Sequence, residues 1–219
     1  GTRFLPAAKA QPKEMFPVID KPVIQYIVEE AVAAGIEEII FVTAIGKRAL
    51  EDHFDKNFEL DERLREKGKL KELAEVQKVA RLAKYAFVRQ LEPRGDGDAI
   101  LSALPFISPD EPVAILFGDD IVSGKIPGIK QLISVYEKTG QSVVGVQEVP
   151  HKDVSRYGVI GGKEISKHIW NIEQFVEKPN GKDAPSNMAV IGRYVVTPDV
   201  LRELKNAPAG KDGEVRLAD

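Results

Sequence analysis

Apolar residues follow two alternating periods along the first two thirds of the chain. Residues 23–34 (VIQYIVEEAVAA) carry them at helical spacing and stop before Gly35, and the run 38–43 (EIIFVT) that follows is short and β-rich. The succession then repeats, with helices at 47–54, 95–104 and 129–139 and strands at 85–90, 113–120 and 142–149. Strands that alternate with helices predict βαβ crossovers and a mostly parallel sheet.

Other segments depart from this alternation. Residues 1–22 contain four prolines and no steady period, which predicts a surface loop, whereas residues 55–84 interleave charges of both signs and predict a solvated helical excursion. After residue 150 short strands separated by turns are expected, at 157–162, 168–179 and 188–196, followed by a helix near 198–206. The whole pattern predicts a Rossmann-like α/β fold, with a mostly parallel sheet flanked by helices and a mixed or antiparallel β portion after residue 150. No repeat or linker divides the chain, which predicts one domain over residues 1–219.

Composition narrows the function. A hydrophobic fraction of 43 % is enough for a sizeable core, and a formal net charge of −3 leaves no excess of cations for a nucleic-acid backbone. The chain has no cysteine, which excludes disulfides, thiolate catalysis and cysteine-ligated zinc, and its three histidines are scattered. No apolar run approaches the roughly 20 residues of a transmembrane helix. These features predict a cytoplasmic enzyme with neither nucleic acid nor membrane as a partner.

Polar groups follow several of the predicted strands. Gln90 comes after YAFVR, Asp119 and Asp120 after VAILFG, and Glu177 and Lys178 after WNIEQFV. In open parallel sheets ligands bind beyond the carboxyl ends of the strands, so we expect these groups to converge on one crevice.

The opening stretch GTRFLPAAKAQPKEMFP places a glycine and small residues beside cations. Small residues let backbone N–H groups approach phosphate oxygens, and Arg3 and Lys13 can neutralise their charge. On the residues alone, a proline-rich surface loop with solvated cations is an equally good interpretation.

This stretch resembles the signature loop of the sugar-nucleotide pyrophosphorylases, in which Thr-Arg leads to Pro-Lys-Glu-Met-hydrophobic-Pro. The form GTRFLPAAKAQPKEMFPVIDKPVIQY is similar to the UTP–glucose-1-phosphate uridylyltransferase branch of that family. Further matching motifs follow in order along the chain: FELD, VRQ, RGDGDAI, GDD, YGVI, VEKP, APSNMAVIGRYV and GEVRLAD. The chain departs from the pattern at Ala8, where Thr is usual, and at Asp98, where His is common.

The resemblance implies a magnesium-dependent nucleotidyltransferase of carbohydrate metabolism. Its substrates would be UTP and glucose 1-phosphate, and its products UDP-glucose and pyrophosphate, formed by in-line attack on the α-phosphorus. The resemblance also implies that the family's first strand and C-terminal segment lie outside residues 1–219, and that the full-length protein forms a homo-oligomer.

The resemblance assigns phosphate-binding residues to the beginning of the chain and metal-binding residues to its middle and its last position. Arg3 and Lys13 match the residues that grip the nucleotide phosphates, beside the nucleotide-binding Gly1 and Thr2. Asp119 and Asp219 match the magnesium ligands, whereas Asp120 supports a neighbour or is unrelated. Lys9 also matches a family lysine, for which a solvated lysine is the competing interpretation.

The base and the sugar are assigned to residues near other strand ends. Gln90 suits uracil because an amide offers both a donor and an acceptor, and Gly95 lets backbone approach the base; a plain strand–helix turn is the alternative. On the sugar side the resemblance makes Lys178 a catalytic group that binds the sugar phosphate. It also assigns sugar-binding roles to Gly158, Glu177, Asn187 and Gly192. Without the resemblance, a solvated turn is the better interpretation of Glu177 and Lys178.

Two other functions remain open at the level of the sequence. A related enzyme could use dTTP or CTP with another sugar phosphate, which base contacts near Gln90 would distinguish. A non-catalytic nucleotide-binding module is the second alternative, and the presence of Arg3, Lys13, Asp119 and Lys178 together argues against it.

Overall fold

A computed structural model describes residues 4–210 and 213–218. The opening segment is more ordered than the predicted loop. It contains the 3-10 turns η2 (Ala7–Lys9) and η3 (Lys13–Met15) and a small hairpin of β1 (Pro17–Val18) and β2 (Lys21–Pro22). The segment ends where helix α1 (Val23–Ala33) begins.

A parallel strand pair with two helices builds the first half of the molecule. Strand β3 (Glu38–Thr43) pairs in parallel with β4 (Lys84–Arg89), and α1 and α2 (Arg48–Phe54) pack against the pair. Their shared core is apolar, and the ring of Phe41 stacks on Phe54 with centroids 4.9 Å apart. The buried residues of this core are Ile24, Val28, Phe41, Leu50 and Phe54.

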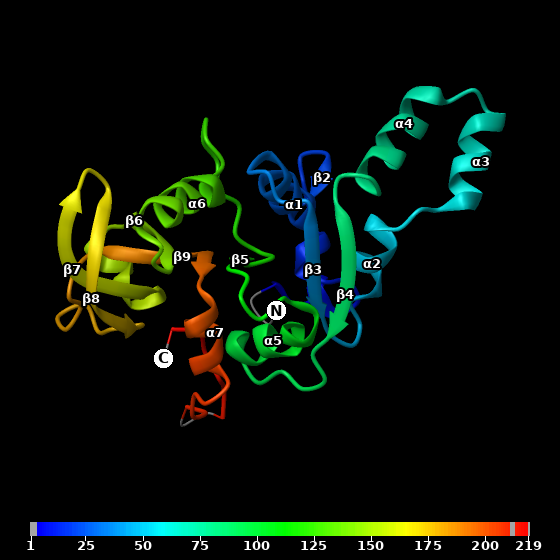
Figure 1. Cartoon of the computed structure of the whole chain (residues 1–219). Helices are drawn as coiled ribbons and strands as arrows, with labels where there is room; N and C mark the ends of the chain where they lie inside the picture. The colour runs from blue at the N-terminus through cyan, green and yellow to red at the C-terminus, as the bar shows by residue number, and fades with distance from the viewer. Residues whose placement is uncertain (1–3, 211–212, 219) are drawn as a thin grey trace.

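The charge-rich segment forms the predicted helical excursion. Helices α3 (Phe58–Glu66) and α4 (Leu70–Val79) project from the molecule beside α2 (Figure 1). Asn57 caps α3 by accepting a hydrogen bond from the backbone N–H of Leu60 (2.9 Å), which satisfies one of the free donors of the first turn.

Strand β9 (Met188–Val196) organises the second half. It pairs antiparallel with β5 (Val113–Leu116) and β6 (Val143–Glu148), and at Ala189 with β7 (Gly158–Ser166). Strands β7 and β8 (Ile169–Glu177) form a hairpin. Helices α5 (Asp96–Ala103), α6 (Gly128–Thr139) and α7 (Pro198–Leu204) accompany this sheet. Its core contains Ile100, Tyr194, Val196, Leu201 and Leu204.

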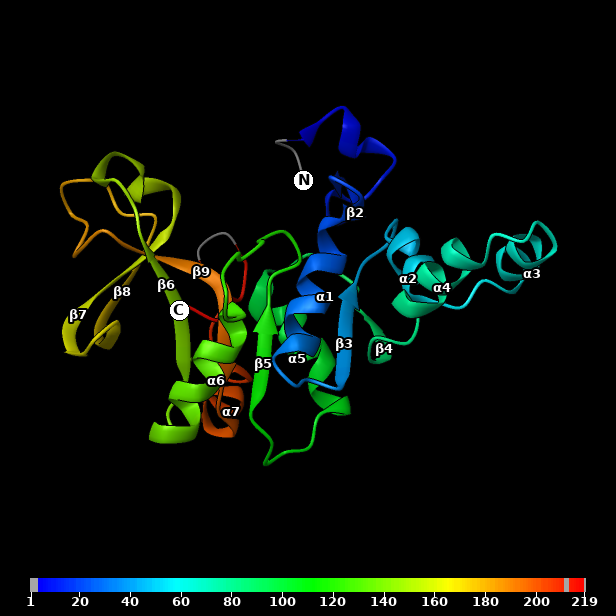
Figure 2. The ribbon, with the colours of Figure 1, turned by 90° about the horizontal axis from the view of Figure 1, so that it is seen from above.

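The predicted fold class is confirmed: helices flank a parallel strand pair and a β portion that is antiparallel. In the view from above, α1 lies between β5 of the antiparallel sheet and β3 of the parallel pair (Figure 2). Among the described residues, parallel pairing is found between β3 and β4, whereas β5 and β6, expected in the parallel part, both pair with β9 in the opposite direction. The strand expected at 113–120 ends at Leu116, and residues 117–120 form a turn.

Within residues 4–210 and 213–218, no helix combines the length and the apolar character that crossing a membrane requires.

Candidate active site

The structure brings Lys13 of the opening loop into contact with Asp119 of the turn after β5. The Nζ of Lys13 donates a hydrogen bond to Oδ2 of Asp119, although 106 residues separate them in sequence. Both side chains remain accessible, with 28 % and 45 % of their surface exposed. An ion pair this accessible contributes only about 0–1 kcal/mol to stability, so both groups can be rearranged by a bound ligand.

Glu14, the neighbour of Lys13, is buried and anchors the loop. Its Oε1 accepts a hydrogen bond from Nζ of Lys47 at 2.9 Å, and only 7 % of the residue is exposed. A Cβ atom added to Gly118 would lie 3.3 Å from Cγ of Glu14. The loop that carries Lys13 is therefore packed against the turn that carries Asp119, and glycine at position 118 allows this approach.

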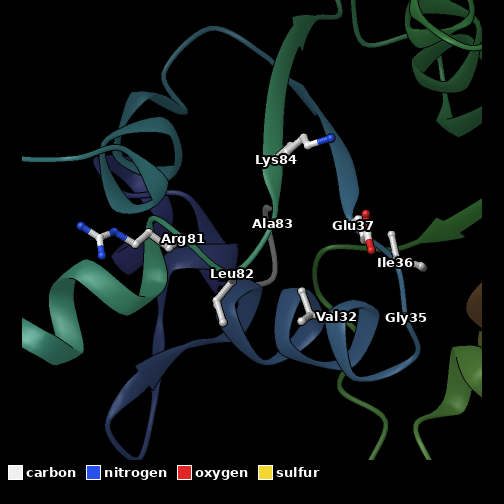
Figure 3. Close-up of a pocket in the computed structure, with 8 residues that line it drawn as sticks. All are labelled: Val32, Gly35, Ile36, Glu37, Arg81, Leu82, Ala83 and Lys84. Carbon is white, nitrogen blue, oxygen red and sulfur yellow. The ribbon is translucent and has the colours of Figure 1, made fainter.

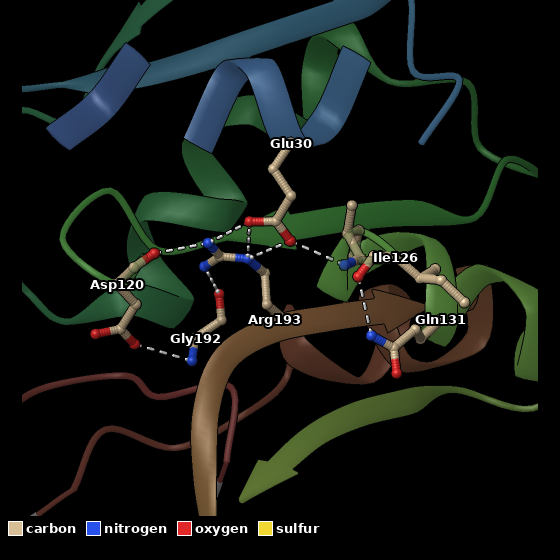
Figure 4. A network of polar contacts seen from close by, with 7 residues as sticks. Glu30, Asp120, Ile126, Gln131, Gly192 and Arg193 are labelled. Atoms are coloured by element: carbon tan, nitrogen blue, oxygen red, sulfur yellow. Dashed lines mark hydrogen bonds and ion pairs between the residues drawn. The ribbon is translucent and has the colours of Figure 1, made fainter. Parts of the chain in front are cut away.

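A buried arginine fixes the same turn from the other side (Figure 4). Arg193 on β9 is completely buried, and its Nη2 donates to Oε2 of Glu30 at 2.7 Å and to the carbonyl oxygen of Asp120 at 2.6 Å. Oε1 of Glu30 also accepts from the backbone N–H of Ile129 at the start of α6 (2.9 Å). One ion pair thus joins α1, α6, β9 and the turn beside Asp119.

Gly192 is held by the same turn. Its N–H donates to Oδ2 of Asp120 (3.0 Å), and its carbonyl oxygen accepts from the N–H of Phe117 (2.8 Å). A Cβ atom at this position would lie 2.4 Å from Cβ of Phe117. The packing of the fold therefore requires glycine at position 192. Asp120, whose role the sequence left open, holds Gly192 through this hydrogen bond. A contact of Gly192 with sugar stays a prediction.

The carboxylate of Asp119 is a suitable ligand for a magnesium ion, and magnesium binding there stays a prediction. Magnesium in phosphate-handling sites uses one or two carboxylates together with substrate phosphate and water. Asp119 offers an accessible carboxylate that already faces a cation, Lys13. The described part of the chain contains no group of three or more His, Asp or Glu residues placed to hold a metal. The second expected ligand, Asp219, lies outside the described residues, as do Gly1, Thr2 and Arg3.

Gln90 lies directly after β4 and is engaged by the glycine turn. Its backbone N–H donates to the carbonyl oxygen of Thr43 (2.8 Å), which continues the parallel ladder with β3. Its Nε2 donates to the carbonyl oxygen of Gly95 (3.1 Å) and to Oδ2 of Asp98 (2.7 Å). Gln90 and the glycine turn are therefore in direct contact, while the predicted contact of both with a base stays a prediction.

The glycines of this turn accommodate the chain itself. Gly95 has a φ of +98°, and a Cβ atom there would lie 2.3 Å from the carbonyl oxygen of Val215. That oxygen accepts from the N–H of Gly97 (2.9 Å), and the N–H of Val215 donates to the carbonyl oxygen of Arg94 (2.7 Å). The close backbone approach expected for a ligand is thus already made by the segment around Val215.

Glu177, Lys178 and Gly158 meet where β8 ends. Gly158 and Glu177 are paired residues of the β7–β8 hairpin, and a Cβ atom at Gly158 would lie 3.0 Å from Oε2 of Glu177. Lys178 has a φ of +44°, and its N–H donates to the carbonyl oxygen of Tyr157 (3.0 Å). Its Nζ lies 2.8 Å from Oε1 of Glu177. The Nδ2 of Asn187 donates to Oε1 of Glu148 (3.1 Å).

The electrostatics of Tyr194 connect these groups. Burial raises the pKa of the Tyr194 hydroxyl, and the negative charges of Asp96, Glu177 and Asp120 raise it further. Tyr194 therefore lies within electrostatic reach of carboxylates from the glycine turn, the end of β8 and the turn after β5. The convergence of the strand-end groups on one crevice stays a prediction.

The sequence analysis missed the buried residues that hold the loop of Lys13 and the turn of Asp119 in place. Glu14 lies inside the PKEM motif, but nothing local predicts its burial against Gly118. Arg193 lies in an apolar strand next to Gly192, and a charge in such a position is the one available hint of a buried partner.

A surface cavity lies apart from this site. Its volume is about 460 Å³, and it lies at the amino ends of β3 and β4, whereas Gln90 follows the carboxyl end of β4 (Figure 3). It is lined by Val32 of α1, by residues 35–37 before β3 and by residues 81–84.

Comparison with known proteins agrees with this geometry. The nucleotidyl transferase family matches residues 1–219. The UTP–glucose-1-phosphate uridylyltransferase of Bacillus subtilis (strain 168) is 52 % identical over 219 residues, which are 100 % of this chain and 75 % of that protein.

Solved structures give the same result. A UDP-glucose pyrophosphorylase complexed with UDP-glucose is 41 % identical with a TM-score of 0.87, covering 100 % of this chain and 80 % of that one. A UTP-bound UGPase from Acinetobacter baumannii is 36 % identical with a TM-score of 0.90, covering 99 % of this chain and 76 % of that one. This chain belongs to the nucleotidyl transferase family and, within it, to the UTP–glucose-1-phosphate uridylyltransferases.

Proposed function

We propose that this protein transfers the uridylyl group of UTP to glucose 1-phosphate, forming UDP-glucose and pyrophosphate. The observation that supports this most directly is the contact between Lys13 and Asp119, which lie far apart in sequence. A cation that we propose to bind phosphate thus lies beside a carboxylate that we propose to bind a metal, in a chain of this family. Both side chains are accessible, so a nucleotide can reach them.

The reaction is an in-line displacement. A phosphate oxygen of glucose 1-phosphate forms a bond to the α-phosphorus of UTP, and the bond from that phosphorus to the bridging oxygen of pyrophosphate breaks. The attacking oxygen is already anionic, so the step needs neither a protein nucleophile nor a strong base. The protein must hold two anions that repel each other in line, which is catalysis by positioning and charge stabilisation.

The cations divide this task. Lys13 faces the α-phosphate and Arg3 the departing β- and γ-phosphates, while Lys178 holds the phosphate of the sugar. The backbone N–H of Lys178 donates to the carbonyl oxygen of Tyr157, and its ammonium lies next to Glu177.

Asp119 and Asp219 are the proposed ligands of magnesium. The ion would orient the phosphates and neutralise part of their charge. Asp119 supports this proposal because its carboxylate is accessible and lies next to Lys13.

The remaining groups select the substrates. Gln90 and the backbone near Gly95 face uracil, beside the nucleotide-binding Gly1 and Thr2. Glu177 accepts hydrogen bonds from sugar hydroxyls, and Gly158, whose lack of a side chain admits the ring of Phe175 and that carboxylate, contacts the sugar through its backbone. Gly192 and Asn187 complete the proposed sugar contacts.

Turnover of the purified protein tests the proposal. UTP, magnesium and glucose 1-phosphate should give equimolar UDP-glucose and pyrophosphate. Lys13→Met should abolish the reaction, while Lys138→Met, at an exposed position of α6, should leave it intact. Preference for dTTP or CTP would show a different member of the family. Binding of UTP without any turnover would show the non-catalytic alternative.

The family resemblance also supports a place in carbohydrate metabolism, in the cytoplasm where nucleoside triphosphates are made, and a homo-oligomeric full-length protein. Light scattering measures the oligomeric state, and a monomer at working concentration would contradict that last proposal.

A further inference from the structure

The side-chain amide of Gln90 is fixed in one of its two orientations. Its Nε2 carries two hydrogens, and the carbonyl oxygen of Gly95 (3.1 Å) and Oδ2 of Asp98 (2.7 Å) accept them. Both partners are pure acceptors when Asp98 is ionised, so only the nitrogen can face them. A rotation of the amide by about 180° would direct Oε1 at a carbonyl oxygen and a carboxylate, which is repulsive.

This orientation leaves only the amide oxygen of Gln90, a hydrogen-bond acceptor, for a ligand. Within the described residues no donor is bonded to Oε1 of Gln90, and this oxygen is not among the buried atoms that lack a partner. Both N–H groups are in use. Gln90 therefore offers an acceptor and no free donor.

We propose that Asp98 is a positioning residue for base selection, which acts by locking the amide of Gln90 with its oxygen toward the base. This proposal rests on the proposed function, in which Gln90 contacts the base. Uracil has an N–H group at ring position 3, which an acceptor can bind. Cytosine has a lone pair at that position, so the locked oxygen faces another acceptor and repels it.

The lock gives Gln90 a selectivity between uracil and cytosine that a freely rotating glutamine lacks. A freely rotating amide offers its oxygen to uracil or its nitrogen to cytosine and so discriminates poorly between them. Two acceptors on Nε2 remove the second option. Selectivity then comes from a repulsive contact with the wrong base as well as an attractive contact with the right one.

A purely structural role for Asp98 predicts a different outcome. Asp98 lies in the first turn of α5, where a carboxylate stabilises the helix through its dipole. Loss of that effect would disturb the glycine turn and lower the use of every nucleotide by the same factor. The two roles are therefore separated by a ratio of substrates rather than by activity with one of them.

The experiment compares kcat/KM for UTP, dTTP and CTP in the wild type, Asp98→Asn, Gln90→Ala and the double variant. Asparagine keeps the size of Asp98 but can also donate to Oε1, so that only the carbonyl oxygen of Gly95 still opposes the rotated amide. We expect the UTP/CTP ratio to fall about tenfold in Asp98→Asn, the loss of roughly one hydrogen bond's discrimination. The UTP/dTTP ratio should not change, because thymine presents the same N–H at position 3.

Two further measurements show that the effect passes through Gln90. Asp98→Asn should leave the UTP/CTP ratio unchanged in a Gln90→Ala background, and Ser102→Ala, which removes a hydroxyl bonded to the carbonyl oxygen of Asp98 one turn on, should leave it unchanged in the wild type. Equilibrium binding of UTP and CTP by calorimetry should show the same ratios without turnover.

Parallel losses for UTP and CTP in Asp98→Asn would overturn the role of Asp98. If Gln90→Ala collapses the UTP/CTP ratio while Asp98→Asn preserves it, the base contact of the proposed function stands and the lock alone is wrong. If Gln90→Ala also preserves the ratio, the base contact is wrong and the lock falls with it.

Discussion

At the scale of single residues, the candidate site contains side chains that directly follow strands and whose backbone N–H groups are hydrogen-bonded to the neighbouring strand or loop. Lys178 is the clearest case, because a residue other than glycine adopts a φ of +44° there and its N–H is bonded to Tyr157. Such a backbone persists only where its surroundings impose it, and it is often found in functional sites. Its ammonium lies beside Glu177 at the end of β8.

Replacing Lys178 by alanine should therefore lower kcat/KM about a hundredfold, on the order of 3 kcal/mol of transition-state stabilisation. The reason is that the phosphate of the attacking sugar loses its cation. Steady-state kinetics with varied glucose 1-phosphate measures the loss. Lys182→Ala, an exposed lysine in the following loop, is the matched control, and equal effects of the two variants would contradict the assignment.

Gly95 makes a second residue-scale prediction. Gly95→Ala introduces a Cβ atom 2.3 Å from the carbonyl oxygen of Val215, at a positive φ. We expect a loss of unfolding free energy about 1–3 kcal/mol greater than that of Gly68→Ala, because Gly68 also has a positive φ but has open space around it. Urea unfolding gives both values. Hydrogen exchange should also show the segment around Val215 released, and protection as in the wild type would argue against this clash.

At the scale of elements, a buried ion pair joins parts of the fold that share no local sequence. Glu30 of α1 and Arg193 of β9 are 163 residues apart and bind each other, the start of α6 and the turn at Asp120. Removing one partner leaves an unpaired buried charge, which in proteins costs about 3–5 kcal/mol.

Arg193→Met should accordingly reduce the unfolding free energy by about 3–5 kcal/mol, and Glu30→Gln should also destabilise. The double variant should lose less than the two single losses added together, because it leaves no charge without its partner. Chemical denaturation measures all three. Arg48→Met, which breaks an exposed pair with Asp52 on α2, should change stability little, and a loss as large as that of Arg193→Met would refute the distinction.

At the scale of the whole molecule, the proposed nucleotide site draws on both halves of the fold. Lys13 belongs to the opening loop and Gln90 to the parallel pair, whereas Asp119 follows a strand of the antiparallel sheet. A ligand that contacts all of them links the two sheets. It should therefore stabilise the protein as a unit rather than one half of it.

UTP with magnesium at about 100 times its dissociation constant should raise the unfolding free energy by about 2.7 kcal/mol, because it binds the folded state alone. The same concentration of UTP with a chelator should stabilise less. Calorimetric unfolding checks both, and Asp119→Asn should remove the difference between them. An equal increase of the unfolding free energy with and without magnesium would contradict a metal ion at this site.

Much of the architecture follows from local pattern. Helical periods at 23–34 and 129–139 and the apolar run at 38–43 appear as α1, α6 and β3 within a few residues. Such elements are predictable because their signals lie in neighbouring side chains. The ordered motifs, from GTRFLP to GEVRLAD, identified the family for the same reason, since they are read along the chain.

What the sequence by itself determined is therefore the elements, the family and the kind of group at each strand end. Only the tertiary structure decided which of those groups meet. It joined Lys13 to Asp119 and Arg193 to Glu30, reversed β5 and β6 against β9, and placed Asp98 on the amide of Gln90. Contacts across 106 or 163 residues depend on the path of the whole chain, and even the nearby orientation of an amide depends on which acceptors the fold brings to it.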